Sequence, residues 1–352
     1  MINAMPKAVG LNHQIVEGIS HPIIREVLAL VNGTSGAHPR TDWGMQPPGI
    51  AALLKQRYNH LRLPLKVKIG ATPRFPAVVD NGTAWVAFSA GKDSMASALM
   101  LRAEGYTPVM YHVHGLNRSY PREKRWAQQS AAAAGLRIVV DKMIVRGKSI
   151  YLEAPFKNQL LAGMLVSRMF GSGGARYVLG NHVGEQLVNP TPTENTHWSD
   201  AEATVTGYDE HLRRMVPGLM PHRSTLRGDT HALAVVAQHG LVEYIHGCIL
   251  PARYVKTVRR SVIKKGGGAR LMPGRCGTCL KCTREEIILQ AMGIRQPNKG
   301  LIDHSLKRLR VIAEGVRPGH GAVDPMTYVL DHAELAIWKG TQWPHQLTGP
   351  SL

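Results

Sequence analysis

The stretch that most constrains this chain is residues 84–104, where the sequence predicts a strand, a tight loop and a helix in direct succession. Residues 84–88 form a short apolar run, Ala-Trp-Val-Ala-Phe, which is typical of a buried strand. Residues 95–104 are rich in Ala, Leu and Met, and Gly105 follows them, which favours a helix that ends there. A strand that passes through a loop of small residues into a helix N-terminus is suited to holding a phosphate group, because the unpaired N–H groups of the first turn carry partial positive charge.

The loop itself combines small residues with side chains that donate hydrogen bonds. We predict that all six of its residues contact the phosphates of a nucleotide: Ser89, Ala90, Gly91, Lys92, Asp93 and Ser94. The serine hydroxyls and the lysine ammonium are donors, the aspartate is suited to cap the helix, and the predicted catalytic residues are Lys92, Asp93 and Ser94. The alternative is an ordinary Ser- and Asp-capped helix, which follows a strand in many α/β domains.

From residue 84 onward, predicted strands alternate with predicted helices. The strands are expected at 84–88, 108–113, 137–140 and 176–179, and the helices at 95–104, 122–134 and 153–170. This alternation predicts an α/β fold, a doubly wound parallel sheet with helices on both faces. Ligands of such sheets bind at the carboxyl ends of the strands, and His112 and Asn181 are predicted to contact the nucleotide there. Beyond the last strand the pattern is less regular, and its acidic residues are candidates to hold Mg²⁺ beside a triphosphate: Asp200, Glu202 and Asp209.

The region before this pattern, residues 1–80, contains no chemical motif. Helices are expected at 16–31 and 50–61, with a Gly- and Pro-rich linker between them at 32–49. Residues 63–69 alternate apolar and basic side chains, which predicts an edge strand. We expect an accessory N-terminal region here, and a helical extension at 296–352.

The four cysteines of the chain all lie in one region. Cys276, Cys279 and Cys282 form two overlapping Cys-x-x-Cys steps, and Cys248 completes a set of four. Four thiolates are a full tetrahedral set for structural zinc, and in a large chain without other cysteines this spacing favours metal over disulfides. An iron–sulfur cluster is the alternative metal group.

The charge of the chain is strongly positive. It contains 43 Lys and Arg against 24 Asp and Glu, a formal net charge of +19. The stretch 249–275 holds no acidic residue and eight basic ones: Arg253, Lys256, Arg259, Arg260, Lys264, Lys265, Arg270 and Arg275. Such a segment predicts a nucleic acid or an acidic protein as partner, with a solvated loop as the alternative. The absence of long apolar runs and of a signal-peptide pattern predicts a cytoplasmic protein that does not cross a membrane.

The loop at 89–94 resembles the Ser-Gly-Gly-x-Asp-Ser signature of the PP-loop ATP pyrophosphatases, with Ala90 in place of the first glycine. Together with the lone cysteine and the Cys-Gly-x-Cys-x-x-Cys run, it is similar to 7-cyano-7-deazaguanine (preQ0) synthase of the deazaguanine, or queuosine, pathway. The resemblance covers about residues 84–290. It implies the adenine nucleotide alpha hydrolase-like type of α/β fold with a zinc-binding subdomain. It also implies ATP, Mg²⁺ and Zn²⁺ as cofactors, and an ATP-dependent C–N ligase that converts 7-carboxy-7-deazaguanine and ammonia to an amide and then a nitrile.

We therefore expect a PP-loop ATP-binding domain at 81–245 and a four-cysteine zinc-binding region with its basic insertion at 246–295. Three alternatives remain open. The enzyme could adenylate a tRNA base, or join the deazaguanine acid to another amine in a defence or viral DNA-modification role. The third is a basic zinc module that binds nucleic acid without catalysis. The sequence also leaves a homodimer open.

Overall fold

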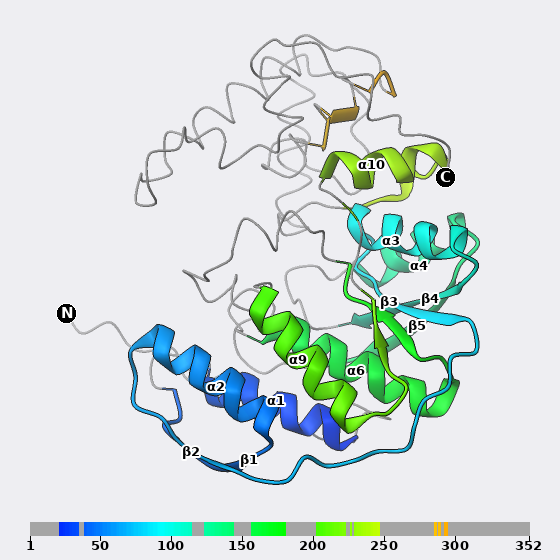
Figure 1. Cartoon of the computed structure of the whole chain (residues 1–352). Coiled ribbons are helices and arrows are strands. Elements are labelled where there is room, and N and C mark those ends of the chain that lie inside the picture. The colour runs from blue at the N-terminus through cyan, green and yellow to red at the C-terminus, as the bar shows by residue number, and fades with distance from the viewer. Residues whose placement is uncertain are drawn as a thin grey trace, which may run out of the picture. The chain divides into compact units, whose positions relative to one another are not determined.

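The computed structural model describes residues 21–34, 39–114, 123–143, 156–180, 202–222, 226, 229–246, 285–286, 288–289 and 292–294 (Figure 1). The chain divides into two compact units. The first unit contains the described residues up to 88 and those at 104–114, 136–143, 156–180 and 202–222. The second unit contains residues 89–103 and 123–135 and the described residues from 226 onward.

The first unit is built on a five-stranded parallel sheet whose order is β5-β4-β3-β6-β7. Its strands are β3 (Thr83–Ala87), β4 (Thr107–His114), β5 (Arg137–Lys142), β6 (Arg176–Val178) and β7 (Met220–Pro221). Each neighbouring pair is parallel, as the helical connections between the strands require. The α/β class and the parallel sheet flanked by helices are confirmed, and this arrangement is compatible with a doubly wound fold.

The strand order reverses beside β3. The chain first adds β4 and β5 on one side of β3, and then places β6 against its other side. In open parallel sheets, ligands bind where the order reverses, beyond the carboxyl ends of the two strands concerned. The chain leaves the carboxyl end of β3 directly into the loop at 89–94, and the end of β6 leads toward residue 181. The loop at 89–94 therefore follows, along the chain, the strand beside which the order of the sheet reverses.

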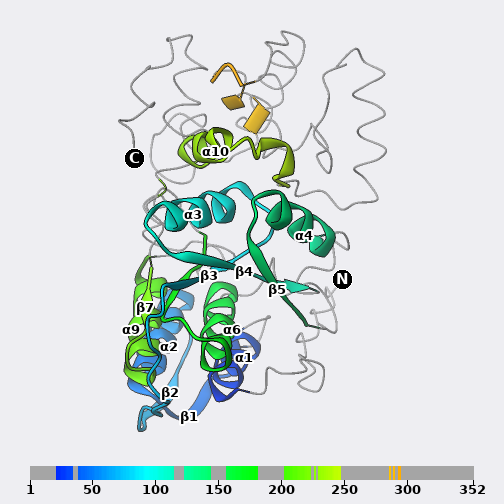
Figure 2. The same cartoon turned by 90° about the vertical axis from the view of Figure 1, so that its right-hand side faces the viewer.

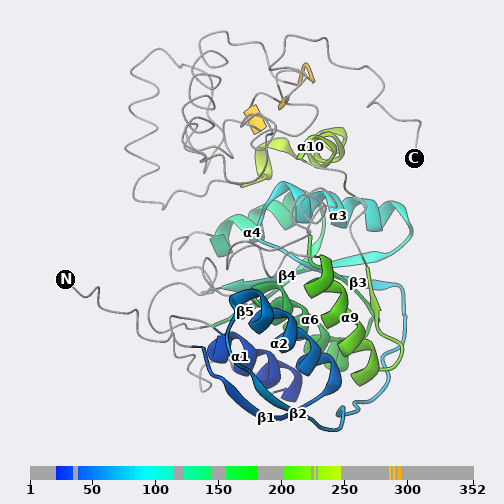
Figure 3. The ribbon, with the colours of Figure 1, turned by 60° about the vertical axis from the view of Figure 1, so that its left-hand side comes forward.

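Four helices belong to the first unit: α1 (Pro22–Thr34), α2 (Pro48–Leu61), α6 (Lys157–Ser172) and α9 (Glu202–Met215). α6 packs on β3 and β6, α1 packs on α6, and α2 packs on α9 (Figures 2 and 3). The buried positions of α1, from Ile23 through Val27 to Thr34, recur at helical spacing, so one face of the helix enters the core. The helices before residue 62 thus share one hydrophobic core with the sheet.

A buried polar network fixes α6 against the sheet. The Arg168 guanidinium of α6 forms an ion pair with Asp141 at the end of β5, with 2.7 Å between Nε and Oδ2. The Tyr111 hydroxyl of β4 donates to the same carboxylate at 2.6 Å. Because both partners of the buried carboxylate are supplied by neighbouring elements, its desolvation is compensated.

The second unit contains α3 (Lys92–Ala103), α4 (Glu123–Ala133), α10 (Asp229–Gln238) and the 3₁₀ turn Val242–Tyr244. α10 packs along α3, and the 3₁₀ turn contacts α4. At its end, the ring of His246 stacks on Trp126 of α4, with 4.9 Å between ring centroids and an interplanar angle of 9°.

Two sequence expectations were wrong in detail. Residues 42–46, predicted within a linker, form strand β1 (Asp42–Gln46), which pairs in parallel with β2 (Lys66–Ile69). The predicted edge strand at 63–69 is confirmed as β2. The region after β6, expected to be irregular, contains α9 and α10. The cysteine residues, the basic stretch 249–275 and the extension 296–352 lie outside the described residues. No described helix is long and apolar enough to cross a membrane.

Candidate nucleotide-binding loop

The loop between β3 and α3 has a backbone shape that its sequence does not favour. Ala90 has a φ of 64°, in the left-handed region that glycine tolerates and that costs other residues roughly 1–2 kcal/mol. Ala90 therefore has a backbone conformation that is typical of glycine.

The backbone donors of the loop are unused within the described part of the chain. No described atom accepts a hydrogen bond from the N–H groups of Ser89, Ala90 or Gly91. The first helical hydrogen bond of α3 runs from the Met95 N–H to the Gly91 carbonyl at 3.2 Å, so the N–H groups of the first turn also lack intrahelical acceptors. Unpaired N–H groups at a helix N-terminus are suited to binding an anion.

Gly91 leaves space that the described protein atoms do not fill. A Cβ placed on it would meet only the Ser89 hydroxyl, at an ordinary 3.5 Å, and its φ does not lie in the left-handed region. Neither packing nor backbone strain within the described residues therefore requires a glycine. A ligand that approaches the backbone closely would require one.

The Ser94 hydroxyl helps to hold the loop closed. It donates to the Gly91 carbonyl at 3.2 Å and is buried. One turn further along α3, the Ser97 hydroxyl donates to the Asp93 carbonyl at 2.9 Å, a local bond made by many helical serines. The hydrogen bond from Ser94 therefore links the loop residue Gly91 to the first turn of α3.

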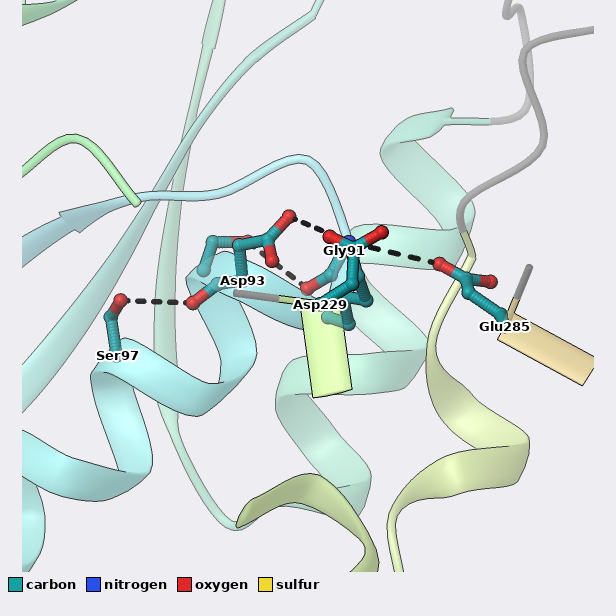
Figure 4. A network of polar contacts seen from close by, with 7 residues as sticks. Gly91, Asp93, Ser97, Asp229 and Glu285 are labelled. Carbon is teal, nitrogen blue, oxygen red and sulfur yellow. Dashed lines mark hydrogen bonds and ion pairs between the residues drawn. The ribbon is translucent and has the colours of Figure 1, made fainter. Parts of the chain in front are cut away.

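The Lys92 ammonium contacts three carboxylates. Two of the three residues that supply them, Asp229 and Glu285, are labelled with Asp93 in Figure 4. Its Nζ lies 2.7 Å from Asp229 Oδ1 at the start of α10, 3.1 Å from Asp93 Oδ2, and 4.0 Å from Glu285 Oε1. The lysine side chain is 2% exposed and that of Glu285 is completely buried. In this position the ammonium forms ion pairs with the carboxylates around it and is shielded from solvent.

Electrostatics keep this lysine charged. Burial is the largest influence and favours the neutral amine, but the carboxylates of Asp93, Asp229 and Glu285 together outweigh it and raise the pKa of Lys92. Three carboxylates therefore contact one ammonium in this cluster.

Asp93 lies inside the first turn of α3, which begins at Lys92. The prediction that it caps the helix was wrong, because its Oδ2 accepts from the lysine ammonium. Its Oδ1 is buried and has no hydrogen-bond partner among the described residues. That oxygen is the best-placed candidate ligand for Mg²⁺ in the described part of the loop.

His112 supports the loop from the neighbouring strand. Its Nδ1 lies 2.9 Å from the carbonyl oxygen of Phe88, the residue immediately before the loop, and its side chain is buried. A carbonyl oxygen only accepts, so Nδ1 carries the proton. The sequence predicted a direct nucleotide contact for this residue, and the described contact is with the backbone of Phe88, just before the loop.

No protein-family model matches the chain, and no curated protein matches its sequence.

The other predicted site residues divide into two groups. Asp209, a candidate for Mg²⁺, lies in α9 and accepts a hydrogen bond from the buried Tyr177 hydroxyl of β6, so it belongs to the core. Six others lie outside the described residues: Asn181, Asp200, Cys248, Cys276, Cys279 and Cys282. Within the described part of the chain, no group of three or more His, Cys, Asp or Glu side chains is arranged to bind a metal ion.

Sequence reasoning missed two members of the lysine cluster. Asp229 follows Gly228 at the start of an apolar segment, which marks a helix N-terminus but no active site. Glu285 is the first of two adjacent glutamates after the last cysteine, and the sequence indicates no role for it. Nothing in the local sequence of either residue indicates a contact with Lys92, because the contact is made by tertiary packing.

Proposed function

We propose that the chain is an ATP-dependent C–N ligase of the PP-loop type, similar to 7-cyano-7-deazaguanine synthase. The observation that carries the proposal is the loop at 89–91. Its left-handed Ala90 presents three backbone N–H groups that no described atom uses, immediately before the N-terminus of α3. This is the chemistry that grips the pyrophosphate portion of ATP.

The residues present fit ATP and Mg²⁺. The open space at Gly91 allows phosphate oxygens to approach the backbone, and the N–H groups would donate to the β- and γ-phosphates. Asp93 Oδ1 would contribute one ligand to Mg²⁺, which in nucleotide sites keeps several waters and takes few protein carboxylates. Ser94 would keep the loop closed around the phosphates through its bond to Gly91.

The reaction proposed here is the one that the resemblance implies, and the N–H groups of the loop and the Asp93 carboxylate support it. A carboxylate oxygen of 7-carboxy-7-deazaguanine, or of a related acid, attacks the α-phosphorus of ATP, and pyrophosphate leaves with the electron pair of the broken P–O bond. Loop N–H groups stabilise the charge that develops on the pyrophosphate. Ammonia then attacks the acyl carbon of the adenylate, loses a proton, and displaces AMP to give the amide. A second ATP-dependent dehydration would convert the amide to the nitrile.

The cysteine region fits zinc by the chemistry of its donors. Cys248, Cys276, Cys279 and Cys282 supply four thiolates, which saturate a tetrahedral ion and leave no position for a catalytic water. We assign zinc the role of stabilising the fold around the site, and every chemical step above is made by other groups.

The test is pyrophosphate release from ATP, measured with 7-carboxy-7-deazaguanine and ammonia and with product analysis by mass spectrometry. Wild-type protein should release pyrophosphate only when the acid is present. Asp93→Ala and Ser94→Ala should abolish this release while circular dichroism shows a retained fold. Ser97→Ala is the matched control, because it also removes a buried α3 hydroxyl but leaves the loop bond in place.

Two outcomes would contradict the proposal. Absence of any acid-dependent pyrophosphate release would remove the ligase function and favour a non-catalytic nucleic-acid-binding protein. Release that requires tRNA, with modified tRNA as product, would favour the alternative in which a tRNA base is adenylated.

A further inference from the structure

One continuous stretch of the first unit carries charges of a single sign. Residues 43–79 contain six Lys and Arg and no Asp or Glu. Arg57 is buried. The other five basic side chains are exposed: Lys55, Arg62, Lys66, Lys68 and Arg74. Because the surface of a soluble domain ordinarily mixes both signs, an exposed stretch without acids is expected where a polyanion binds.

Strand β2 presents its two lysines on the face that is turned away from the hydrophobic core. Val67 packs against the core, and side chains alternate along a strand, so Lys66 and Lys68 share the opposite face. Alternate residues of a strand are about 6.6 Å apart, so the two lysines form a short row of charges. β1 and β2 lie on the far side of α1 and α2 from the five-stranded sheet, which leaves this face open (Figures 1 and 2).

Exposed apolar side chains lie beside these lysines. Met45 of β1 is the register partner of Lys68 and is 74% exposed, and Ile69 at the end of β2 is 64% exposed. Neighbouring strands are about 4.8 Å apart, so Met45 and Lys68 are direct neighbours across the sheet. Together, Met45, Lys66, Lys68 and Ile69 form the β1–β2 surface. Each nucleotide of a single strand carries a phosphate charge and an apolar base face, and this surface offers a complement to both.

One acidic residue lies on the same pair of strands. Asp42 is the register partner of Lys66, and its Oδ1 accepts a hydrogen bond from the Gly44 N–H at 3.1 Å. The Arg40 guanidinium donates to the Asp42 carbonyl, which puts a further cation beside this residue. The two strands and Arg40 together hold three basic side chains and one acidic one, so the local charge stays positive.

Arg62, which precedes β2, stands at a position where helices commonly have glycine. It is the C-cap of α2, with a φ of 53° in the left-handed region, and its side chain is exposed. A strained residue that is not glycine points to a use for its side chain. A cation at a helix C-terminus also interacts favourably with the helix dipole, so a binding assay has to separate the two roles.

We propose that the β1–β2 surface, together with Arg62, binds single-stranded nucleic acid. The basic side chains would contact phosphates, and Met45 and Ile69 would pack against bases. Because most of these contacts are to the backbone of the nucleic acid, we expect little sequence preference and a Kd on the order of 1–100 µM near physiological salt. The inference goes beyond the proposed function and does not depend on it, since no residue of the nucleotide loop takes part.

The experiment measures binding of a fluorescent oligouridine of about 20 nucleotides to the full chain, by anisotropy without ATP, from about 50 to about 200 mM salt. Lys66→Gln/Lys68→Gln removes two charges and keeps long side chains. It should weaken binding about 10-fold or more and flatten the slope of log affinity against log salt by about 1.4, since each phosphate contact contributes about 0.7. The matched control, Lys124→Gln/Arg125→Gln, removes two exposed charges of α4 and should leave affinity and slope at wild-type values. Equal thermal midpoints would show that both variants fold.

Two further variants test the apolar contacts and Arg62. Met45→Ala/Ile69→Ala should weaken binding of the single strand about 3-fold without changing the salt slope, because it removes apolar area and no charge. The same variant should bind a duplex of equal length as wild type does. Arg62→Gly should weaken binding of the single strand while the thermal midpoint stays level or rises, because glycine adopts a left-handed φ readily.

Four outcomes would overturn the inference. The first is wild-type protein that does not bind the oligonucleotide, and the second is a β2 lysine variant with unchanged affinity and slope. Equal losses in the β2 and α4 variants would assign binding to the net charge of the whole chain. Polyglutamate that displaces the oligonucleotide equally well, charge for charge, would make an acidic protein the partner. Wild-type affinity of Met45→Ala/Ile69→Ala for the single strand would remove the base contacts from the proposal. All these measurements are made without ATP, so they leave the ligase proposal to its own test.

Discussion

The free-energy cost of the left-handed conformation of Ala90 can be measured by comparing two Ala→Gly substitutions. Ala90→Gly and Ala98→Gly each remove one methyl group from a residue of the second unit that is completely buried. Ala90 lies in the loop with φ at 64°, whereas Ala98 lies in the middle of α3. The two variants therefore differ chiefly in the backbone conformation of the mutated residue.

The expected magnitudes follow from three contributions. Loss of a buried methyl group costs about 0.8 kcal/mol, and the added freedom of glycine in the unfolded chain costs about 0.5–1 kcal/mol. Both contributions apply at both positions. Only at residue 90 does glycine also relieve left-handed strain of about 1–2 kcal/mol. We expect Ala98→Gly to lower the free energy of unfolding by about 1.5 kcal/mol and Ala90→Gly to leave it nearly unchanged.

The assay is urea denaturation of both variants and wild type under the same metal conditions, compared through the midpoint and the slope. The affinity of Ala90→Gly for a non-hydrolysable ATP analogue should equal that of wild type, because residue 90 already has a left-handed φ that glycine adopts readily. If Ala90→Gly is as destabilising as Ala98→Gly, residue 90 is not strained and the loop does not have the conformation on which the anion site depends.

Three further predictions concern other parts of the chain. Burial raises the pKa of Glu123 to about 7 from 4.5, so the folded protein keeps a proton that the unfolded chain releases. Stability should therefore fall as the pH rises from about 4.5 to about 7, and Glu123→Gln should flatten this part of a pH series of unfolding midpoints. Gly218 has a φ of 83°, and a Cβ there would lie 2.3 Å from the Val78 carbonyl oxygen. Gly218→Ala should therefore destabilise the fold by at least about 2 kcal/mol, clearly more than Gly240→Ala, where φ is 67° and no atom of the described residues lies within 4 Å of the added Cβ. Elemental analysis should find one zinc per chain, and Cys279→Ser should lower both the metal content and the thermal midpoint; a metal-free wild type would contradict this.

The secondary structure around the loop could be predicted because its signals are local. An apolar run of strand length, a small-residue loop and a helix rich in Ala, Leu and Met gave β3, the loop and α3 with small errors at their ends. The same logic gave β4, α4 and β5. It failed at β1, whose residues Asp42–Gln46 include Gly44 and lack the alternation of a strand, because pairing with β2 rather than propensity forms it.

The candidate site was predictable only in part. The hexapeptide predicts an anion-binding loop, since small side chains and hydroxyls before a helix favour phosphate binding. It could not show that Ala90 takes a left-handed conformation, because the surrounding structure imposes that strain on the residue. The sequence also suggested a phosphate contact for Lys92, where the structure shows a buried ion-pair cluster.

The sequence by itself therefore determined the α/β class, the parallel strand–helix alternation and the loop that follows β3, because each depends on residues that are neighbours in the chain. Only the tertiary structure decided what these residues contact. Asp229 and Glu285 are distant from Lys92 in sequence, as are Phe88 from His112 and Ala90 from His246. A buried charge or backbone carbonyl must find a partner when it loses water, and packing of the whole unit selects which distant group supplies it.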